Sequence, residues 1–306
     1  MRVDMLRAVS IIVVVVLVDI CASLISCSGD TDRIAVSPPQ SPPIGNVEAV
    51  WSPDGKTIAV AWSGSPFHRR QGIYLVDTTD WNVDTLQIAG EYQTPFFSSP
   101  SWSPDGAWIV FATNAQIFRI KANGDSLTQL TNKDRHWSCD WSDSDSLIVF
   151  NTSLGESSGV WLMDPDGENA RLLVRYGSHI DFTIGDSVFF IEKVSDNRKL
   201  AHMVLIYPVD STTREVYRWE TGNPYSAYYY PEVSPNGEMV ALSIDGNIWT
   251  LSLEGENMRP LTNHGGQYPS WSPDGKSILY CKPDTNGGEL WIMNADGSSQ
   301  HHLNGW

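Results

Sequence analysis

Trp51-Ser52-Pro53-Asp54-Gly55 precedes a short apolar segment, and the same five residues return at 102–106 and 271–275. Looser copies begin at Val233, Trp141 and Phe182, so the chain holds six related segments. We call their first residues the anchors; successive anchors are 51, 39, 41, 51 and 38 residues apart. A repeat of about 40 residues that contains only strands is typical of the blades of a β-propeller.

Every repeat has room for four strands. In the last repeat they are predicted at 267–272, 277–281, 289–293 and 300–303. Proline presets φ, aspartate can bond its own backbone and glycine accepts positive φ, so Pro-Asp-Gly predicts a tight turn after the first strand. Tryptophans such as Trp102 and Trp271 recur at equivalent places, which predicts packing between blades. We therefore predict an all-β fold, a six-bladed β-propeller of four-stranded antiparallel blades, with the fourth blade the least regular.

The N-terminal segment has the features of an export signal. Arg2 and Arg7 precede an apolar run over residues 8–18, which is shorter than the ~20 residues of a membrane span. Leu24-Ile25-Ser26-Cys27 resembles the lipobox of bacterial lipoproteins, in which the cysteine is acylated. We predict a lipoprotein signal peptide over residues 1–26 and lipidation of Cys27; the alternative is an ordinary secretory signal cut near Ala22.

Residues 27–46 are predicted to be a tether between the lipid and the propeller. The segment is rich in proline and serine, which favours an extended chain. The propeller itself is assigned to residues 47–306. Ser28 follows Cys27, as in lipoproteins that are sorted to the outer membrane. We therefore expect an exported protein that is anchored by its lipid in the outer membrane and faces the periplasm.

Charge and cysteine content limit the range of partners. The formal net charge is −16, which excludes a nucleic-acid or anionic-lipid binder, so we expect no nucleic acid as a partner. Cys139 and Cys281 lie in the third and sixth repeats, too far apart for a disulfide, and are predicted to be buried thiols. We expect a monomer.

Three patterns could carry chemistry, and each has a simpler explanation. Residues 155–159 fit the esterase pattern G-x-S-x-G, but they join two strands instead of a strand and a helix. Residues 164–168 resemble part of a calcium loop but lack its distal glutamate, so a turn explains them better. His68, His136, His179 and His264 fall on one predicted face without forming a symmetric ring. We therefore predict no catalytic set, no cofactor and no metal.

The repeats resemble those of the TolB-type propeller, a WD-like repeat of bacterial periplasmic proteins. The resemblance covers roughly residues 47–304 and rests on the Trp-Ser-Pro-Asp-Gly segments. TolB carries an N-terminal α/β domain before its propeller, and the stretch between Cys27 and the first repeat is too short for such a domain. The resemblance implies an envelope protein whose propeller binds other proteins or glycans.

The two faces of the predicted propeller differ in sequence. The Pro-Asp-Gly turns make one face short, repetitive and acidic. The opposite face carries long, individual loops with aromatic and basic side chains, the composition that recognition surfaces use. We predict that this face, at the mouth of the central channel, binds the partner through Arg69, Arg70, Arg135, His136, Trp137, Arg175, His179, Tyr228, Tyr229, Tyr230 and Tyr268.

These features together predict a non-enzymatic envelope lipoprotein whose propeller is a scaffold for an envelope protein or a cell-wall glycan. The alternative is a propeller enzyme, a metal-assisted lyase or hydrolase acting on carbohydrate, which would use the loop histidines.

Overall fold

The computed structural model describes residues 47–63, 71–86, 97–144, 146–152, 157–175, 177–183, 185–193, 200–207, 212–220, 230–283 and 288–303. The chain divides into two compact units, Met1–Gln40 and Ser41–Trp306, and all described residues belong to the second. They form six sheets of four antiparallel strands each. The predicted fold class, an all-β six-bladed propeller, is confirmed.

Each sheet is built from one sequence repeat, so each repeat is one blade. Blades one to three contain β1 (Val47–Trp51), β2 (Thr57–Trp62), β3 (Gly72–Asp77) and β4 (Val83–Leu86); β5 (Phe97–Trp102), β6 (Trp108–Thr113), β7 (Gln116–Lys121) and β8 (Thr128–Gln129); and β9 (His136–Trp141), β10 (Ile148–Thr152), β11 (Gly159–Met163) and β12 (Arg171–Arg175). Blades four to six contain β13 (Gly177–Phe182), β14 (Val188–Lys193), β15 (Leu200–Tyr207) and β16 (Thr212–Glu220); β17 (Glu232–Val233), β18 (Met239–Ile244), β19 (Asn247–Ser252) and β20 (Arg259–Pro260); and β21 (Gln267–Trp271), β22 (Ser277–Lys282), β23 (Glu289–Asn294) and β24 (His301–His302).

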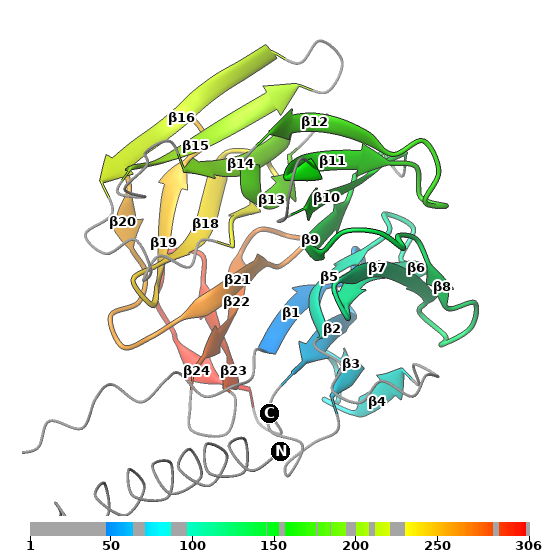
Figure 1. Cartoon of the computed structure of the whole chain (residues 1–306). Helices are drawn as coiled ribbons and strands as arrows, with labels where there is room; N and C mark the ends of the chain where they lie inside the picture. The colour runs from blue at the N-terminus through cyan, green and yellow to red at the C-terminus, as the bar shows by residue number, and fades with distance from the viewer. Residues whose placement is uncertain are drawn as a thin grey trace, which may run out of the picture. The chain divides into compact units, whose positions relative to one another are not determined.

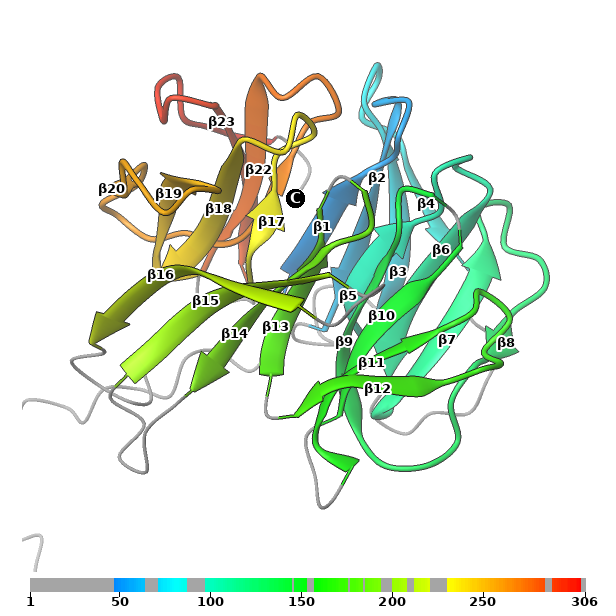
Figure 2. The ribbon, with the colours of Figure 1, turned by 90° about the horizontal axis from the view of Figure 1, so that it is seen from above.

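The six blades close into a ring around their first strands. In Figure 1 the first strands lie nearest the middle, and fourth strands such as β8, β12 and β16 lie at the periphery. Figure 2, turned by 90°, shows the sheets standing as separate blades. Strand β1 contacts both β5 and β21, which closes the ring, and each of the six sheets takes its four strands from a single repeat.

The anchor motif is a turn whose side chains hold its own backbone. In the second blade the Ser103 hydroxyl donates to Asp105 Oδ1 at 2.6 Å, and the same hydroxyl oxygen accepts from Trp108 N at 2.9 Å. Asp105 Oδ1 also accepts from Ala107 N at 2.9 Å, and Gly106 supplies the positive φ of 69° that the turn requires. The motif is repeated because every blade needs this turn.

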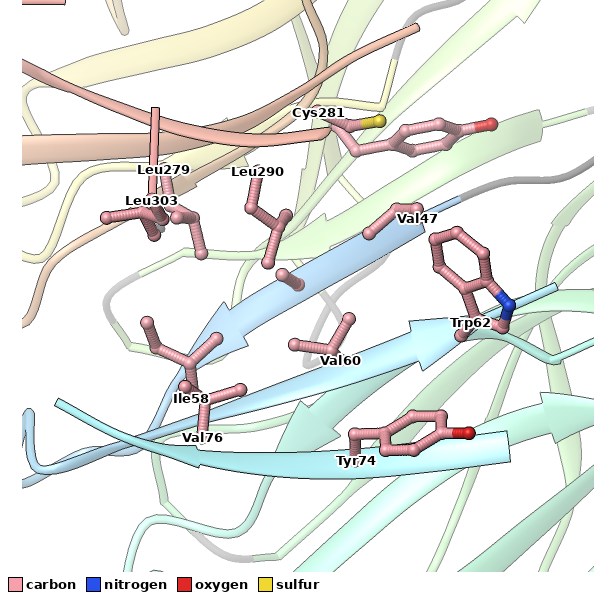
Figure 3. Packing of buried hydrophobic residues seen from close by; sticks show 12 residues of the cluster. Val47, Ile58, Val60, Trp62, Tyr74, Val76, Leu279, Cys281, Leu290 and Leu303 are labelled. Carbon is pink, nitrogen blue, oxygen red and sulfur yellow. The ribbon is translucent and has the colours of Figure 1, made fainter. Parts of the chain in front are cut away.

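Six hydrophobic clusters fill the six spaces between neighbouring blades. Side chains alternate along a strand, so Ile58 and Val60 of β2 face blade six while Ala59 and Ala61 face blade two. Figure 3 shows the cluster between blades one and six, where residues of β1, β2 and β3 meet Leu279, Leu290 and Leu303. Burial of apolar surface between blades, at roughly 25 cal/mol per Å², is therefore what closes the ring.

Blade four departs from its neighbours in a way that the sequence did not indicate. Strands β15 and β16 pair over eight positions, from Leu200–Glu220 to Tyr207–Thr212, with a bulge between Met203 and Val204. A second bulge interrupts the pairing of β13 with β14. Blade three also has two register shifts, and blades two and six have one each, so the bulges do not make blade four the least regular. What sets it apart is the length of β15 and β16, which was not predicted (Figure 1).

Two smaller predictions also have an outcome. Cys139 and Cys281 are both free and buried, as predicted. Within the part of the chain that the structure describes, no helix has the length and apolarity needed to cross a membrane.

Candidate functional site

Two rings of side chains line the central channel. Counted back from each anchor, residues one and three positions earlier both line the channel, although a β-bulge interrupts the first strand there in four of the blades. The inner ring, one position before the anchors, is Val50, Ser101, Asp140, Asp181, Glu232 and Ser270. The mouth ring, three positions before the anchors, is Glu48, Ser99, Ser138, His179, Tyr230 and Tyr268. Together they line a cavity of about 350 Å³.

The carboxyl groups of both rings bind across blade boundaries. Asp140 of blade three accepts from the Ser101 hydroxyl of blade two at 2.6 Å and from Phe182 N of blade four at 2.8 Å. Asp181 of blade four accepts from Val233 N of blade five at 2.6 Å. Two further bonds follow the same pattern: Ser270 of blade six donates to Glu232 of blade five at 3.4 Å, and Ser99 N of blade two donates to Glu48 of blade one. The four carboxyls are therefore part of the contacts that hold neighbouring blades together.

Burial changes the protonation of these carboxyls. It raises the pKa of Glu48 to about 7 and that of Glu232 to about 8, and for Glu232 the nearby charge of Asp140 adds to the effect. Burial, followed by the charges of Asp140 and Glu232, raises the pKa of Asp181 well above its ordinary range. Asp140 and Asp181 are in hydrogen-bond contact, and we assign the shared proton to Asp181, whose pKa is raised further.

One half of the mouth ring is aromatic. The His179 and Tyr230 rings meet edge to face at 5.2 Å between centroids, and Tyr230 and Tyr268 lie 4.2 Å apart. These three residues have φ values of 51°, 32° and 53°, in the left-handed region that bulky residues rarely adopt. Ser99, at the same position in blade two, has a φ of 46°, and at Ser99, His179 and Tyr268 the first strand carries a β-bulge, so the conformation belongs to the bulge.

The other half of the mouth is polar and opens into a second cavity. This side pocket has a volume of about 300 Å³ and is lined by Glu48, Ser98, Trp137, Ser138, Asn151, His179 and Tyr230. Asn151 Oδ1 accepts from Trp137 N at 3.2 Å and from Ser138 N at 3.0 Å, which fixes the start of β9. Trp137 keeps 40% of its side chain exposed.

The structure brings together four of the predicted partner-binding residues. Trp137, His179 and Tyr230 line the side pocket; Tyr268 lines the channel but is 7% exposed and belongs to the core between blades one and six. Arg135 and Arg175 are exposed but line neither cavity. Arg69, Arg70, Tyr228 and Tyr229 lie outside the described residues, as does the predicted lipidation site Cys27.

His136 does not belong to this surface, and its inclusion among the partner-binding residues was wrong. Its side chain is 4% exposed and packs against the Phe150 ring at 5.1 Å. The ring nitrogens lie 2.8 Å from Lys133 O and 3.2 Å from Asn151 O. Burial lowers its pKa, so the ring is a neutral core residue near neutral pH.

Sequence reasoning missed the channel carboxyls. It assigned acidic residues to the turn face, whereas Glu48, Asp140, Asp181 and Glu232 line the channel between the two faces. A signal was present: three successive repeats carry an acidic residue immediately before the anchor. An acidic residue next to a buried anchor in a strand is unusual, and counting back from the anchors would have found it.

The geometry offers little for catalysis in the described part of the chain. No group of three or more His, Cys, Asp or Glu side chains there is arranged to hold a metal ion. Ser157 and Ser158 of the G-x-S-x-G pattern lead directly into strand β11, without the strand-to-helix turn that a nucleophilic serine needs.

Comparisons with known proteins agree with the fold. No protein-family model matches the chain. An uncharacterised protein of Agrobacterium fabrum is 24% identical over 237 residues, which are 73% of this chain and 64% of that relative, so the chain spans less than two thirds of its length.

Solved structures of TolB proteins share this fold, as the resemblance implied. A putative TolB from Agrobacterium tumefaciens superposes with a TM-score of 0.59 at 15% identity, over 72% of this chain and 83% of that one. TolB from Acinetobacter baumannii gives 0.62 at 17% identity, over 84% and 62%. An oligogalacturonate lyase from Vibrio parahaemolyticus gives 0.54 at 11% identity, over 84% and 92%. At these identities the likeness is one of fold.

Proposed function

We propose that this chain is an exported, lipid-anchored envelope protein whose propeller is a non-enzymatic binding scaffold. One observation carries the proposal: His179 and Tyr230 line one pocket with the exposed Trp137 at an opening of the channel, and the buried Tyr268 packs against Tyr230. Aromatic side chains on a rigid scaffold give binding surfaces large contact area at low entropic cost. The fold shared with TolB supports a scaffold of the TolB type, which binds an envelope protein or a cell-wall glycan.

The buried carboxyls support a scaffold better than an enzyme. A general acid or base must reach the substrate, but the oxygens of Asp140 and Asp181 are bonded to neighbouring blades. The raised pKa values of the channel carboxyls follow from burial. Perturbed pKa values also arise in structural networks, so these values alone do not indicate catalysis.

The test compares the two faces of the propeller. Trp137→Ala and Tyr230→Ala should weaken cross-linking of the protein to its envelope partner in cells, with the melting temperature little changed. The matched control combines Asp54→Asn, Asp105→Asn and Asp274→Asn, which removes charge from the turn face but keeps the acceptor oxygens of the turns. Loss of the cross-link in this control, with none in the mouth variants, would place the binding surface on the turn face instead.

The anchor is tested separately. Cys27→Ser should release the protein from the membrane fraction into the soluble fraction, because acyl chains and not charge would hold it there. If the variant stays in the membrane fraction after a salt wash, the protein is not anchored through Cys27.

A propeller enzyme acting on carbohydrate remains the second candidate, because oligogalacturonate lyases share the fold, one of them in complex with manganese. Metal analysis of the purified protein separates the two. The scaffold predicts no stoichiometric transition metal, and the enzyme predicts a bound metal that is lost when His179 and His264 are replaced.

A further inference from the structure

The side pocket has a hydrogen-bonding end that the protein itself does not use. Asn151 is 8% exposed and lines the pocket. Two backbone N–H groups donate to its amide oxygen, which fixes the orientation of the amide. Its Nδ2 group donates to no acceptor among the residues that the structure describes. Nδ2 is not among the fully buried atoms that lack a partner, so it faces solvent in the pocket and is available to a ligand there.

A second polar group lies next to it. The Ser138 hydroxyl is buried and makes no hydrogen bond in the described part of the chain, and Ser138 lines both the channel and the side pocket. Leaving a buried hydroxyl unsatisfied costs about 1–3 kcal/mol. A ligand that bonds to the Ser138 hydroxyl would recover that free energy, whereas at Asn151 Nδ2 it would take the place of solvent.

Two large aromatic residues line the pocket. Trp137 is 40% exposed. Tyr230 lines the same pocket and packs against His179 and Tyr268. An aromatic face next to hydrogen-bonding groups fits a ligand that has both an apolar face and polar edges. A sugar ring is such a ligand, because its C–H groups form two apolar faces and its hydroxyls form a polar rim.

Charge decides which sugars fit. Glu48 lies in the pocket lining, and Asp140, Asp181 and Glu232 line the adjoining channel, while no Lys or Arg lines either cavity. A carboxylated sugar would meet these carboxyl groups without a Lys or Arg to pair with, and like charges placed opposite one another disfavour binding. Because the pKa of Glu48 is about 7, its carboxyl is present in both forms near neutral pH and can donate to a sugar hydroxyl or accept from it.

We propose that the side pocket binds a neutral sugar residue of a glycan chain, with the ring against Trp137 and Tyr230. Asn151 Nδ2 and the Ser138 hydroxyl bond to hydroxyl oxygens of the sugar, and Glu48 bonds to a further hydroxyl. This inference rests on the proposed function and narrows its partner to a neutral glycan. The pocket volume of about 300 Å³ is at the small end for ligand sites, which fits one sugar unit at a time.

The experiment is titration calorimetry of the purified protein with four neutral trisaccharides: cellotriose, chitotriose, maltotriose and mannotriose. Trigalacturonate is the acidic comparator. We expect at least one neutral trisaccharide to bind, and trigalacturonate to bind at least tenfold more weakly. Trp137→Ala and Asn151→Asp should each weaken binding at least tenfold; the aspartate keeps the oxygen that fixes β9 and removes the donor. Trp81→Ala is the matched control, because Trp81 is 38% exposed and lies in blade one outside the pocket.

The outcomes separate this inference from the proposed function. The sugar inference is overturned if no neutral trisaccharide binds or if trigalacturonate binds as tightly as the neutral trisaccharides. It is also overturned if Trp137→Ala weakens trisaccharide binding no more than Trp81→Ala does. A melting curve for each variant excludes loss of folding as the cause, and Ser138→Ala supplies a second variant if Asn151→Asp does not fold. If an envelope protein is cross-linked at the mouth but no sugar binds, the scaffold function is supported and the sugar inference is overturned.

Discussion

The propeller contains two sets of acidic side chains that behave in opposite ways. The aspartates of the Pro-Asp-Gly turns are exposed, and hydrogen bonds from serine hydroxyls and backbone N–H groups within the turn lower their pKa values, that of Asp274 to about 2. The carboxyls of the channel are buried and bonded to other blades, and their pKa values are raised. The same residue type is thus a local turn element in one region and a contact between blades in the other.

The difference shows how to interpret a repeat protein. Residues that recur from blade to blade, such as the turn serine, which blade four replaces with Thr183, serve the blade itself. Residues that differ from blade to blade at equivalent positions, such as the mouth ring, cannot be explained by the needs of a single blade. In this molecule the binding surface is therefore expected where the repeat is broken.

The largest expected effect concerns the pH dependence of stability. A carboxyl with a raised pKa keeps its proton in the folded protein at a pH where the unfolded chain has already released it. Stability therefore falls as the pH rises from the pKa of the unfolded chain to the pKa of the folded protein. This pH range runs from 4.5 to about 7 for Glu48 and from 4.5 to about 8 for Glu232. Buried His136, with its lowered pKa, acts in the opposite direction below its ordinary value of 6.5. Between pH 6.5 and 8.0 we expect the free energy of unfolding to fall by about 2–4 kcal/mol, measured by urea titration.

Glu232→Gln is the matched variant for this prediction. It keeps the shape and an acceptor for the Ser270 hydroxyl but removes one titrating group. The variant should therefore lose less stability than the native protein over the same range of pH. Stability that stays constant or rises from pH 6.5 to 8.0 would contradict the raised pKa values of the channel.

A smaller effect is expected from the turn serine. Ser103 is fully buried, and its hydroxyl bonds both to Asp105 and to Trp108 N. Ser103→Ala leaves that backbone N–H without its side-chain partner, so we expect a loss of about 1–3 kcal/mol in the free energy of unfolding. Ser277→Ala is the control, because the Ser277 hydroxyl makes no hydrogen bond within the described residues. Equal losses in the two variants would show that the hydroxyl bonds do not stabilise the turn.

The smallest effect is expected from the turn aspartate. Blade five has Asn236 at this position, and Ser234 donates to its Oδ1 at 2.7 Å as Ser103 does to Asp105. The turn therefore needs an acceptor oxygen and not a charge. Asp105→Asn should change the free energy of unfolding by less than about 0.5 kcal/mol, whereas Asp105→Ala should lower it by about 1 kcal/mol. A large loss in the asparagine variant, seen by urea titration, would show that the charge matters.

Much of the fold followed from local sequence. The Pro-Asp-Gly turns, the alternation of apolar residues and the spacing of the anchors depend on chemistry within about 40 residues, so each blade could be predicted from its own repeat. The long pairing of β15 with β16 was not predicted. The length of a strand depends on how many of its backbone groups pair with the neighbouring strand, which the repeat motif does not specify.

The sequence by itself determined the number of blades, the turns and the free, buried state of Cys139 and Cys281. Only the tertiary structure decided that His136 is a core residue and that Asp140, Asp181 and Glu232 surround one channel. The physical reason is distance along the chain. The carboxyls come from repeats 41 to 51 residues apart, and their burial and pKa values exist only once the ring has closed around them.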